Sequence, residues 1–280
     1  MLELPEAGTL ARQLGAALTG RRIVGVGVGA SPHKFAFFSG DPGEYPGALS
    51  GREVTAARAH GGLVELVLGQ TSLLFGDGVG LRLVAAGNAV PGKHQLALEL
   101  DDGSGLFCSV QMYGGLWLGP AGDHDNPYYR MARDRPSPLA EGFDRAYFDD
   151  LVAAARPSLS AKAFLATEQR VPGLGNGVLQ DLLFQARINP RNRLSELGED
   201  HLDDLFASLR ATLAEMTDAG GRDTEKDLYG HPGGYRTRLS ARTLALPCPR
   251  CGAGVRRESF LGGNVYFCPA CQPVRLAVPA

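Results

Sequence analysis

Three residue types that often reveal a protein's environment are scarce in this sequence, whose 280 residues include five cysteines, four methionines and one tryptophan. No apolar run approaches the roughly 18 residues of a membrane-spanning helix. The start, MLELPE, carries two acids and lacks the basic and then apolar segments of a secretory signal peptide. We therefore expect a cytoplasmic protein with no membrane partner, in which disulfide bonds are rare.

A surplus of basic charge is also missing, since 28 Lys and Arg face 30 Asp and Glu and the net charge is −2. This balance argues against a general polyanion binder. The charges are unevenly distributed, however, because residues 221–280 hold nine basic and four acidic side chains. A localised phosphate-contact surface would explain this end of the chain, and a solvated basic face is the plainer alternative.

The pattern along the chain indicates an α+β protein of two compact units. Residues 7–19 carry three leucines at every fourth position, which predicts an amphipathic helix. Short β-rich runs separated by Gly, Pro and Asp-Gly turns fill residues 22–118 and predict an antiparallel sandwich or barrel-like sheet. Residues 119–143 are rich in Pro, Gly and charge, as in a linker, and residues 146–218 have helical patterns.

Four of the five cysteines form two Cys-x-x-Cys pairs, CPRC and CPAC, separated by sixteen residues: Cys248, Cys251, Cys268 and Cys271. Two such knuckles give four thiolates a tetrahedral arrangement that suits Zn²⁺. Two disulfides are the alternative, and the expected cytoplasmic location disfavours them. We predict a structural zinc site, because four thiolates leave no coordination position open for catalysis.

The segment between the two cysteine pairs, GAGVRRESFLGGNVYF, has strand-like ends around a Gly-Gly turn. Hairpins of this kind present their surface to a partner. Arg256 and Arg257 lie on the first half of this hairpin, so nucleic acid is a plausible partner.

A glycine-rich turn lies between two helical patterns, in TEQRVPGLGNGVLQDLLFQARINP (167–190). Free amides at the start of a helix can bind a phosphate, and Asn176 could cap the helix or donate to a phosphodiester. No Gly-Lys-Ser/Thr follows, so the turn is not a nucleotide-binding P-loop. An ordinary helical hairpin with glycines for close packing remains open.

In their order, these pieces resemble the formamidopyrimidine-DNA glycosylase/endonuclease VIII family of base-excision repair enzymes. They are an amino-terminal ELPE, a β-sandwich, a helix–two-turn–helix around GLGN and a terminal finger ending CPACQ. The resemblance covers essentially the whole chain. It implies a β-sandwich catalytic-type domain at 1–120, a hinge at 121–143, a helical DNA-binding domain at 144–235 and a zinc finger at 236–280. It also implies a monomer that clamps double-stranded damaged DNA, flips out the damaged base and cleaves its glycosidic bond, with strand cleavage through a Schiff base.

The resemblance assigns roles to particular residues. Glu3 matches the family's proton-relaying glutamate, and Glu6 matches a second, supporting acid. Lys162, Gln169 and Asn176 fall at the family's spacing before and within GLGN. Lys162 and Asn176 would hold the phosphates that flank the lesion.

Four positions depart from the family pattern. Leu2 replaces the proline whose amine is the family's nucleophile, and a bulky second residue normally prevents removal of Met1. The family's catalytic-domain lysine falls on His60. In the family, an Arg-rich loop called the wedge fills the space that the extruded base leaves in the DNA duplex. The corresponding loop here reads VQMYGG, so Met112 and Tyr113 would be the filling side chains. Gly263 occupies the position in the finger where the family has an arginine.

Two interpretations follow from these departures. In the first, the chain is an active glycosylase in which Glu3 activates a water or the Met1 amine forms a Schiff base, with Glu6 as acid or base and His60 as a titratable donor. Alternatively, Glu3 and Glu6 only complement a helix dipole and His60 is a turn residue. In the second interpretation, which Leu2 favours, the protein binds distorted duplex without excising a base. A zinc-ribbon protein of unrelated function is disfavoured by the order of the motifs.

The stretch GGRDTEKDLYGHPGGYRTR (220–238) stands where the family has its base-recognition loop. Arg222 and Lys226 could contact the extruded nucleotide or its phosphate, and a solvated loop is the alternative.

Overall fold

The computed structural model describes residues 2–275, which form two compact units. The first combines the chain up to Asp134 with Thr217–Tyr235, and the second combines Arg135–Met216 with the chain from Arg236 onward. The predicted α+β class is confirmed, and the first crossing between units falls inside the predicted hinge. The 217–235 segment belongs to the first unit, whereas the domain bounds that the resemblance implies place it in the helical domain at 144–235. No helix among the described residues is long and apolar enough to cross a membrane.

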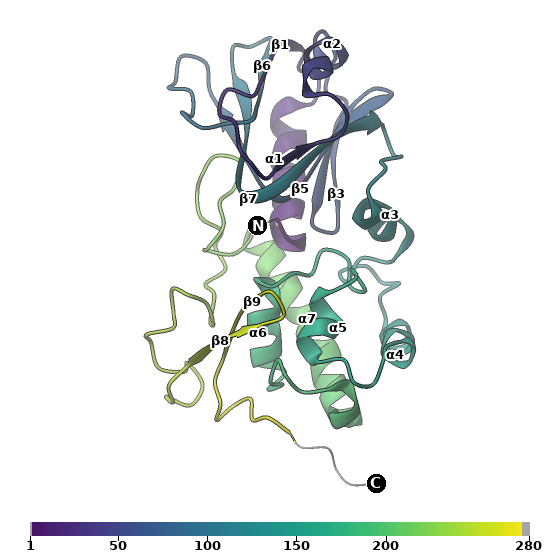
Figure 1. Cartoon of the computed structure of the whole chain (residues 1–280), viewed down its shortest axis with the longest axis vertical. Coiled ribbons are helices and arrows are strands. Elements are labelled where there is room, and N and C mark those ends of the chain that lie inside the picture. The colour runs from purple at the N-terminus through teal and green to yellow at the C-terminus, as the bar shows by residue number, and fades with distance from the viewer. Residues whose placement is uncertain (1, 276–280) are drawn as a thin grey trace. The chain divides into compact units, whose positions relative to one another are not determined.

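The first unit is built on a seven-stranded sheet in the order β1-β6-β7-β5-β4-β3, with β2 paired to β7 (Figure 1). Every pair is antiparallel except β2–β7. The strands are β1 (Ile23–Val28), β2 (Ala36–Phe38), β3 (Ala56–His60), β4 (Leu63–Leu68), β5 (Thr71–Val84), β6 (Leu96–Leu100) and β7 (Gly105–Pro120).

The strands β5 and β7 are the longest in the sheet and pair with each other along most of their length. The sequence pattern predicts two short strands in this region, divided at the Asp-Gly pair 77–78, but residues 71–84 form the single strand β5. A register shift between Asp77 and Val79 divides the two halves. The β-rich character is therefore confirmed, and the Asp-Gly pair that signalled a turn marks a bulge within a strand instead.

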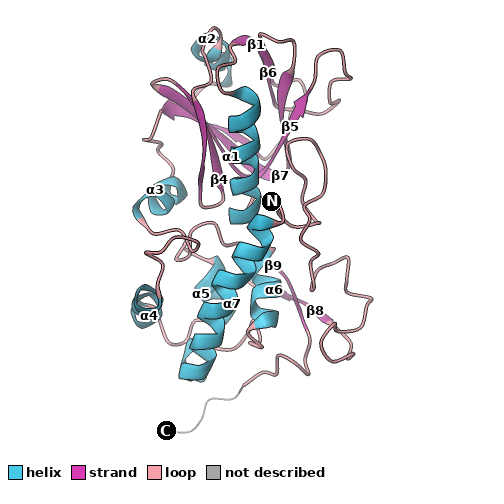
Figure 2. Ribbon diagram, turned by 180° about the vertical axis from the view of Figure 1, so that it is seen from behind, coloured by secondary structure: helices cyan, strands magenta, loops and turns pink. Residues whose placement is uncertain are grey.

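Helix α1 (Leu4–Leu18) lies against the sheet, next to β4 (Figure 2). Its leucines at positions 10, 14 and 18 are buried in the core of this unit, as the four-residue spacing predicted. Pro5 occupies the first turn, where its missing N–H costs no helical hydrogen bond. The helix begins directly after Glu3, which is its N-cap residue, and Glu6 lies in its first turn.

Three further short helices belong to the first unit: a 3-10 turn at Pro42–Glu44, α2 (Tyr45–Leu49) and α3 (Pro127–Asp134). The helix α3 lies within the segment that was predicted to be a linker. The Asn126 side chain accepts the N–H groups of Tyr128 and Tyr129, which caps its first turn. Tyr129 is buried, so this part of the predicted linker is anchored to the sheet.

The second unit contains the helices predicted between residues 146 and 218, followed by the finger hairpin. The helices are α4 (Arg145–Ala154), α5 (Ala161–Ala166), α6 (Val178–Gln185), a 3-10 turn at Leu194–Glu196 and α7 (Glu199–Asp218), whose last residues belong to the first unit. The hairpin consists of β8 (Arg256–Phe260) and β9 (Gly263–Phe267), and β9 lies beside α6 (Figures 1 and 2).

Candidate active site and zinc centre

Glu3, Glu6 and Arg222 form a buried ionic cluster at the start of α1. The Arg222 guanidinium donates from Nε to Glu6 Oε1 at 2.9 Å and from Nη2 to Glu6 Oε2 at 2.8 Å. Its Nη1 lies 3.5 Å from Glu3 Oε1. All three side chains are at most 4% exposed. Burial opposes the charge of Arg222, but the two carboxylates outweigh it and raise the pKa of Arg222 above its usual range.

Glycines allow the chain to bring Arg222 to the acids. Gly221 has a φ of +100°, and a Cβ there would stand 3.3 Å from Glu6 Oε1. The close approach lets the Arg222 backbone N–H donate to Glu6 Oε1 at 3.0 Å. A Cβ on Gly233 would fall 2.2 Å from the Gly221 carbonyl oxygen, so only glycine fits there. The Gly-rich segment, for which the sequence left a base-recognition loop and a solvated loop open, is thus the frame of the cluster, and its Arg222 is buried.

Leu2 lies at the start of this site and packs partly against the core of the first unit. Its backbone N–H donates to the carbonyl oxygen of Asp77 at 2.8 Å. The nitrogen at the position of the family's nucleophile is therefore bound as a hydrogen-bond donor. Met1, the other predicted source of an amine, lies outside the described residues.

A cavity of about 550 Å³ opens beside the cluster. Leu2 and Glu6 line one part of it, and Met112, Tyr113 and Lys226 line others. The remaining lining comes from α1, β5, the segment between β5 and β6, β7 and the 217–235 segment: Leu10, Gly78, Val79, Gly80, Leu81, Arg82, Pro91, Lys93, Phe107, Ser109, Gln111, Thr224, Glu225, Asp227 and Gly230. Its size and its mixed apolar and charged wall suit a small organic group such as a nucleobase.

The predicted wedge residues are exposed on β7 at this cavity. Met112 is 67% and Tyr113 is 49% exposed, which is unusual for large apolar side chains within a strand. The tip of β2 lies next to them, because Gly114 N donates to the Phe35 carbonyl oxygen. Phe35 and Phe37 are also more than half exposed. The face therefore offers several side chains for stacking, and its contact with DNA stays a prediction.

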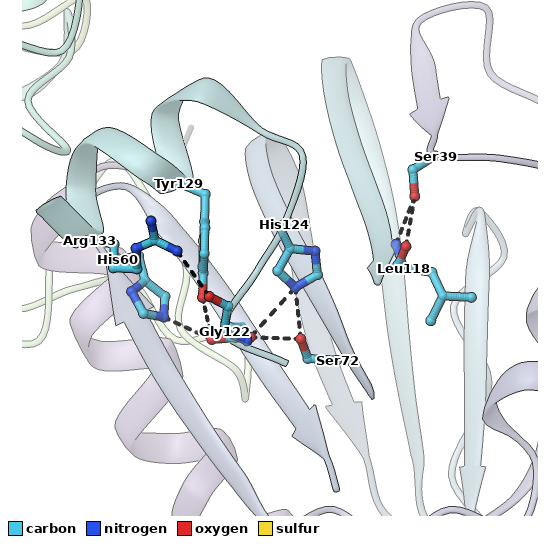
Figure 3. A network of polar contacts seen from close by, with 9 residues as sticks. Ser39, His60, Ser72, Leu118, Gly122, His124, Tyr129 and Arg133 are labelled. Carbon is cyan, nitrogen blue, oxygen red and sulfur yellow. Dashed lines mark hydrogen bonds and ion pairs between the residues drawn. The ribbon is translucent and has the colours of Figure 1, made fainter. Parts of the chain in front are cut away.

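His60 belongs to a different polar cluster, which is centred on Glu65. Its Nε2 lies 2.9 Å from Glu65 Oε2. Figure 3 shows His60, Ser72, His124 and Tyr129 converging in this network. Within the described residues, no contact of His60 reaches Leu2, Glu3 or Glu6. The structure thus does not bring His60 together with the predicted catalytic acids.

Hydrogen bonds hold Glu65 in its ionised form. Burial alone would raise its pKa, but contacts from His124, His60, the Ser72 hydroxyl and the Gly122 N–H outweigh that effect. The pKa of Glu65 consequently lies well below its usual range. Burial and the nearby Glu65 charge raise the pKa of Tyr129 to about 12, so its hydroxyl stays a donor to Glu65.

Sequence reasoning missed Glu65 as a network centre and Arg222 as the partner of the acids. Glu65 interrupts an otherwise apolar run, LVELVL, in which every residue is buried. A lone acid in a fully buried strand is the signal that could have found it. Arg222 stands 216 positions from Glu6, and no local pattern connects them.

In the second unit, the three residues predicted near GLGN serve internal contacts. Lys162 is 3% exposed and donates from Nζ to the Phe260 carbonyl oxygen at 2.5 Å, and burial lowers its pKa. Asn176 donates to the Asn264 carbonyl oxygen at 3.1 Å. Gln169 accepts the Gly173 N–H at 2.9 Å. Lys162 and Asn176 therefore tie the helical part to the finger hairpin, and their phosphate contacts stay predictions.

The four finger cysteines gather as the spacing predicted. Their sulfur atoms all lie within 4.8 Å of one another, with Cys248 and Cys271 3.9 Å apart and Cys251 and Cys268 3.5 Å apart. Tetrahedral Zn²⁺ with bonds of about 2.3 Å places its sulfur ligands about 3.8 Å apart, so the residues fit this ion. The prediction of structural zinc is confirmed, and the thiolates would hold it without an open position.

The finger joins the helical part beyond the zinc ligands. The buried Gln272 side chain accepts the Cys268 N–H and donates to the Ile188 carbonyl oxygen, at 3.0 Å and 2.9 Å. Arg256 and Arg257 lie on β8 and are exposed. These two arginines are therefore accessible to a partner, as their predicted role in binding nucleic acid requires.

The sequence of this chain is similar to those of known proteins. Residues 245–274 match the family model described as a zinc finger found in FPG and IleRS. The formamidopyrimidine-DNA glycosylase of Alkalilimnicola ehrlichii is 31% identical over 287 residues, which cover 97% of this chain and all of the relative. That of Halorhodospira halophila is 32% identical over 279 residues, with the same coverage.

Solved structures agree on the fold. The crystal structure of MutM (FPG) from Thermus thermophilus superposes with a TM-score of 0.78 at 28% identity, covering 97% of this chain and 99% of the other. Lactococcus lactis Fpg, in a complex with DNA containing an abasic site, gives a TM-score of 0.81 at 22% identity over 96% of this chain and 99% of the other. The second likeness concerns the fold alone.

Proposed function

The chain belongs to the formamidopyrimidine-DNA glycosylase family of DNA-repair enzymes, and from this premise we propose that it releases a damaged base from duplex DNA by cleaving the bond between base and sugar. The observation that carries the proposal is the buried Glu3–Arg222–Glu6 cluster beside a cavity of about 550 Å³. A damaged base turned out of the duplex would enter this cavity.

The cluster can support bond cleavage through its negative charge. As the glycosidic bond breaks, positive charge develops on the sugar, and fixed carboxylates close to it stabilise that charge. Two hydrogen bonds from the planar guanidinium fix the Glu6 carboxylate, and Glu3 contacts the same cation more loosely. Arg222 thus holds both acids in place, so little reorganisation is needed when the sugar becomes charged.

Other exposed groups supply the DNA contacts of the proposal. Met112 and Tyr113 would fill the space that the extruded base leaves in the helix, since they are large and exposed at the cavity. Arg256 and Arg257 would neutralise phosphates. Lys226, exposed at the cavity wall, would do the same for the extruded nucleotide.

The test of this function measures base release from purified, zinc-loaded protein. The substrates are duplexes that carry formamidopyrimidine-guanine, 8-oxoguanine, dihydrouracil or an abasic site, and an undamaged duplex is the control. We expect release from at least one damaged duplex. Borohydride added during the reaction would trap any Schiff base to an amine. Tight binding of damaged duplexes without any release would contradict the proposal.

One observation favours a second function, recognition of damaged DNA without excision. The partly buried Leu2 side chain packs against the core, and the Leu2 backbone nitrogen donates to the Asp77 carbonyl oxygen, so this nitrogen is not arranged as a nucleophile. A binding protein would still need the wedge and the finger arginines. It would give wild-type affinity when Glu3 is changed to Gln and no product with any of the four duplexes.

A further inference from the structure

Two phenylalanines are exposed at the short strand β2, which pairs with β7 alone and so forms an edge of the sheet. Phe35 is 57% and Phe37 is 53% exposed. Ala36 and Phe38 pack against the core of the first unit. Successive side chains of a strand point to opposite faces, so Phe37 points outward. Edge strands usually carry polar side chains there, and large apolar side chains that gather on a surface indicate a binding site.

Neighbouring residues hold both phenylalanines in place. The centroids of the Phe37 and Trp117 rings lie 5.6 Å apart. The Phe35 backbone N–H donates to His33 Nδ1 at 3.3 Å, and the Phe35 carbonyl oxygen accepts the Gly114 N–H at 3.2 Å. Side chains on a fixed backbone lose little conformational entropy when they bind a partner. The two rings are therefore prepared to receive a flat group.

Positive charge borders this aromatic surface. The Lys34 ammonium nitrogen lies 5.3 Å from the centre of the Phe35 ring. Ser31, on the same loop, donates from N and Oγ to the two carbonyl oxygens on either side of Lys93, at 3.0 Å and 3.3 Å. Lys34 and Lys93 are both exposed. The two hydrogen bonds of Ser31 thus bring the loops that carry these lysines together.

The segments that form this surface contain no acid. Residues 29–40 and 84–98 include no Asp or Glu, and β7 includes no charged residue. The nearest acids along the chain and across the sheet are placed elsewhere. Asp41 accepts the N–H of Gly43 in the 3-10 turn that follows β2. Asp77 belongs to β5, which pairs with the opposite edge of β7 from β2. The charge of the surface therefore complements a polyanion.

The surface adjoins the cavity from two sides. Lys93 is one of the residues that line the cavity. Tyr113 is another, and it directly precedes Gly114, whose N–H binds the Phe35 carbonyl oxygen. A strand of DNA on this surface would consequently run next to the cavity.

Exposed aromatic rings select unpaired nucleotides. In an intact duplex each base face is covered by the neighbouring base pairs, so a phenyl ring has no face to lie on. A single strand exposes its base faces together with its phosphates, and proteins bind it with aromatic side chains along a positively charged groove. The lysines beside the rings favour this occupant over an apolar segment of a protein.

We propose that Phe35 and Phe37 form a stacking site for unpaired nucleotides of DNA, in which Lys34 and Lys93 hold the phosphates. Two bases lie on the two rings, and the strand continues towards the cavity. The chain consequently binds single-stranded or locally unpaired DNA in preference to intact duplex. This binding requires no release of a base, so the stacking site and the proposed function succeed or fail separately.

The experiment measures binding of undamaged DNA by the zinc-loaded full chain. The probes are an oligothymidine, a fully paired duplex and the same duplex with a central unpaired stretch. Phe35→Leu, Phe37→Leu and the double variant keep an apolar side chain and remove the ring, whereas Phe35→Tyr keeps the ring. Val24→Ala is the matched control, because Val24 is 58% exposed on β1 of the same unit. The readouts are the dissociation constant, its salt dependence, the melting temperature and the sedimentation coefficient.

We expect the wild type to bind the oligothymidine and the partly unpaired duplex more tightly than the paired duplex. Each Leu variant should weaken binding of these two probes at least about fivefold, the lower end of the range for a base stacked on an aromatic ring. Binding of the paired duplex should not change. Phe35→Tyr and Val24→Ala should bind all three probes as the wild type does.

The lysines and the melting temperature give independent readouts. Lys34→Ala should lower the slope of log affinity against log salt for the oligothymidine by about 0.7, the value for one phosphate of a single strand. Because Phe35 and Phe37 are exposed, the Leu variants should melt within about 2 °C of the wild type.

Three outcomes would overturn the stacking site. The first is wild-type affinity for the oligothymidine in the double variant. The second is an equal loss of affinity for paired and unpaired probes, or a melting temperature that falls in step with the affinity. The third is a dimer that the double variant abolishes while its affinity for DNA is unchanged, which would assign the surface to a second copy of this chain. Absence of base release from damaged duplexes would contradict the proposed function alone.

Discussion

Arg222 and Glu6 form a bidentate ion pair in which Nε and Nη2 lie 2.9 Å and 2.8 Å from the two carboxylate oxygens. Both side chains are nearly inaccessible to water. This pair closes the 217–235 segment onto the first turn of α1. It therefore links the integrity of the fold to the position of the acids.

Removing the cation should destabilise the first unit. Arg222→Met removes the cation that Glu3 and Glu6 share in a buried site, and we expect the free energy of unfolding to fall by about 3–5 kcal/mol. The free energy of unfolding should fall less in Arg222→Lys. Lysine keeps the positive charge, although it cannot make the two parallel hydrogen bonds of the guanidinium. Urea denaturation followed by Trp117 fluorescence measures this, since the only tryptophan belongs to the same unit.

The control is Arg21→Met, which breaks an exposed pair with Asp102. We expect the free energy of unfolding to fall by less than about 1 kcal/mol in this variant. Equal losses at Arg21 and Arg222 would show that the buried cluster adds no stability of its own.

The Glu65 network should make stability depend on pH. The folded-state pKa of Glu65 is lowered, so its stabilisation is complete above the unfolded value of about 4.3 and is lost as pH falls towards the folded pKa. The difference in melting temperature between the wild type and Glu65→Gln should therefore be largest near pH 7 and shrink below about pH 4.

Thermal unfolding at several pH values tests this dependence on Glu65. Glu53→Gln serves as the control, because Glu53 lies in an exposed pair with Arg22. A constant difference between wild type and Glu65→Gln from pH 3 to 7 would contradict the assignment of Glu65 as an ionised centre.

Zinc removal should affect the second unit first. Chelation releases the thiolates that hold the β8–β9 hairpin, and Lys162 and Asn176 then lose their partners in the finger. We expect duplex binding to disappear while the Trp117 emission of the first unit is unchanged. Fluorescence and gel-shift measurements on one chelator titration check both. Full affinity in the metal-free protein would disprove the DNA role of the finger.

The wedge should contribute to binding and not to folding. Met112→Ala and Tyr113→Ala remove exposed side chains, so melting temperatures should stay within about 2 °C, corresponding to changes within 0.5 kcal/mol. Each should weaken binding of damaged duplex by about 1–3 kcal/mol, the range for a side chain that stacks on a base. Val24→Ala, also exposed in this unit, should leave affinity unchanged. Unaltered affinity in both wedge variants would rule out stacking.

The finger arginines should act through phosphates. Replacing Arg256 or Arg257 with Ala should lower the slope of log affinity against log salt by about 0.9 per lost contact. The weakening should be equal for damaged and undamaged duplexes, because phosphates carry no sequence or lesion information. Arg52→Ala in the first unit is the control, and a salt slope identical to the wild type in both finger variants would exclude the contact.

The spacing of residues along the sequence was sufficient to predict several parts of this structure. The four cysteines predicted the zinc centre, because two knuckles of fixed length position four thiolates wherever the rest of the chain goes. The leucines at positions 10, 14 and 18 predicted α1 and its buried face, since helical periodicity is a local property. The order of the ELPE, GLGN and finger motifs along the chain was sufficient to identify the family.

Only the tertiary structure showed what the site is made of. From the sequence, Arg222 could contact an extruded nucleotide or lie in a solvated loop. In the fold it is buried, because two glycines let its backbone reach Glu6 across 216 positions. The phosphate role that the resemblance assigns to Lys162 stays a prediction, but only the fold shows that its Nζ donates to the Phe260 carbonyl oxygen. Asp77 reads as a turn, yet it lies in a continuous strand beside Leu2. Sequence patterns report spacing along the chain, whereas the partners of a buried charge depend on which distant segments the packing brings within a few ångströms.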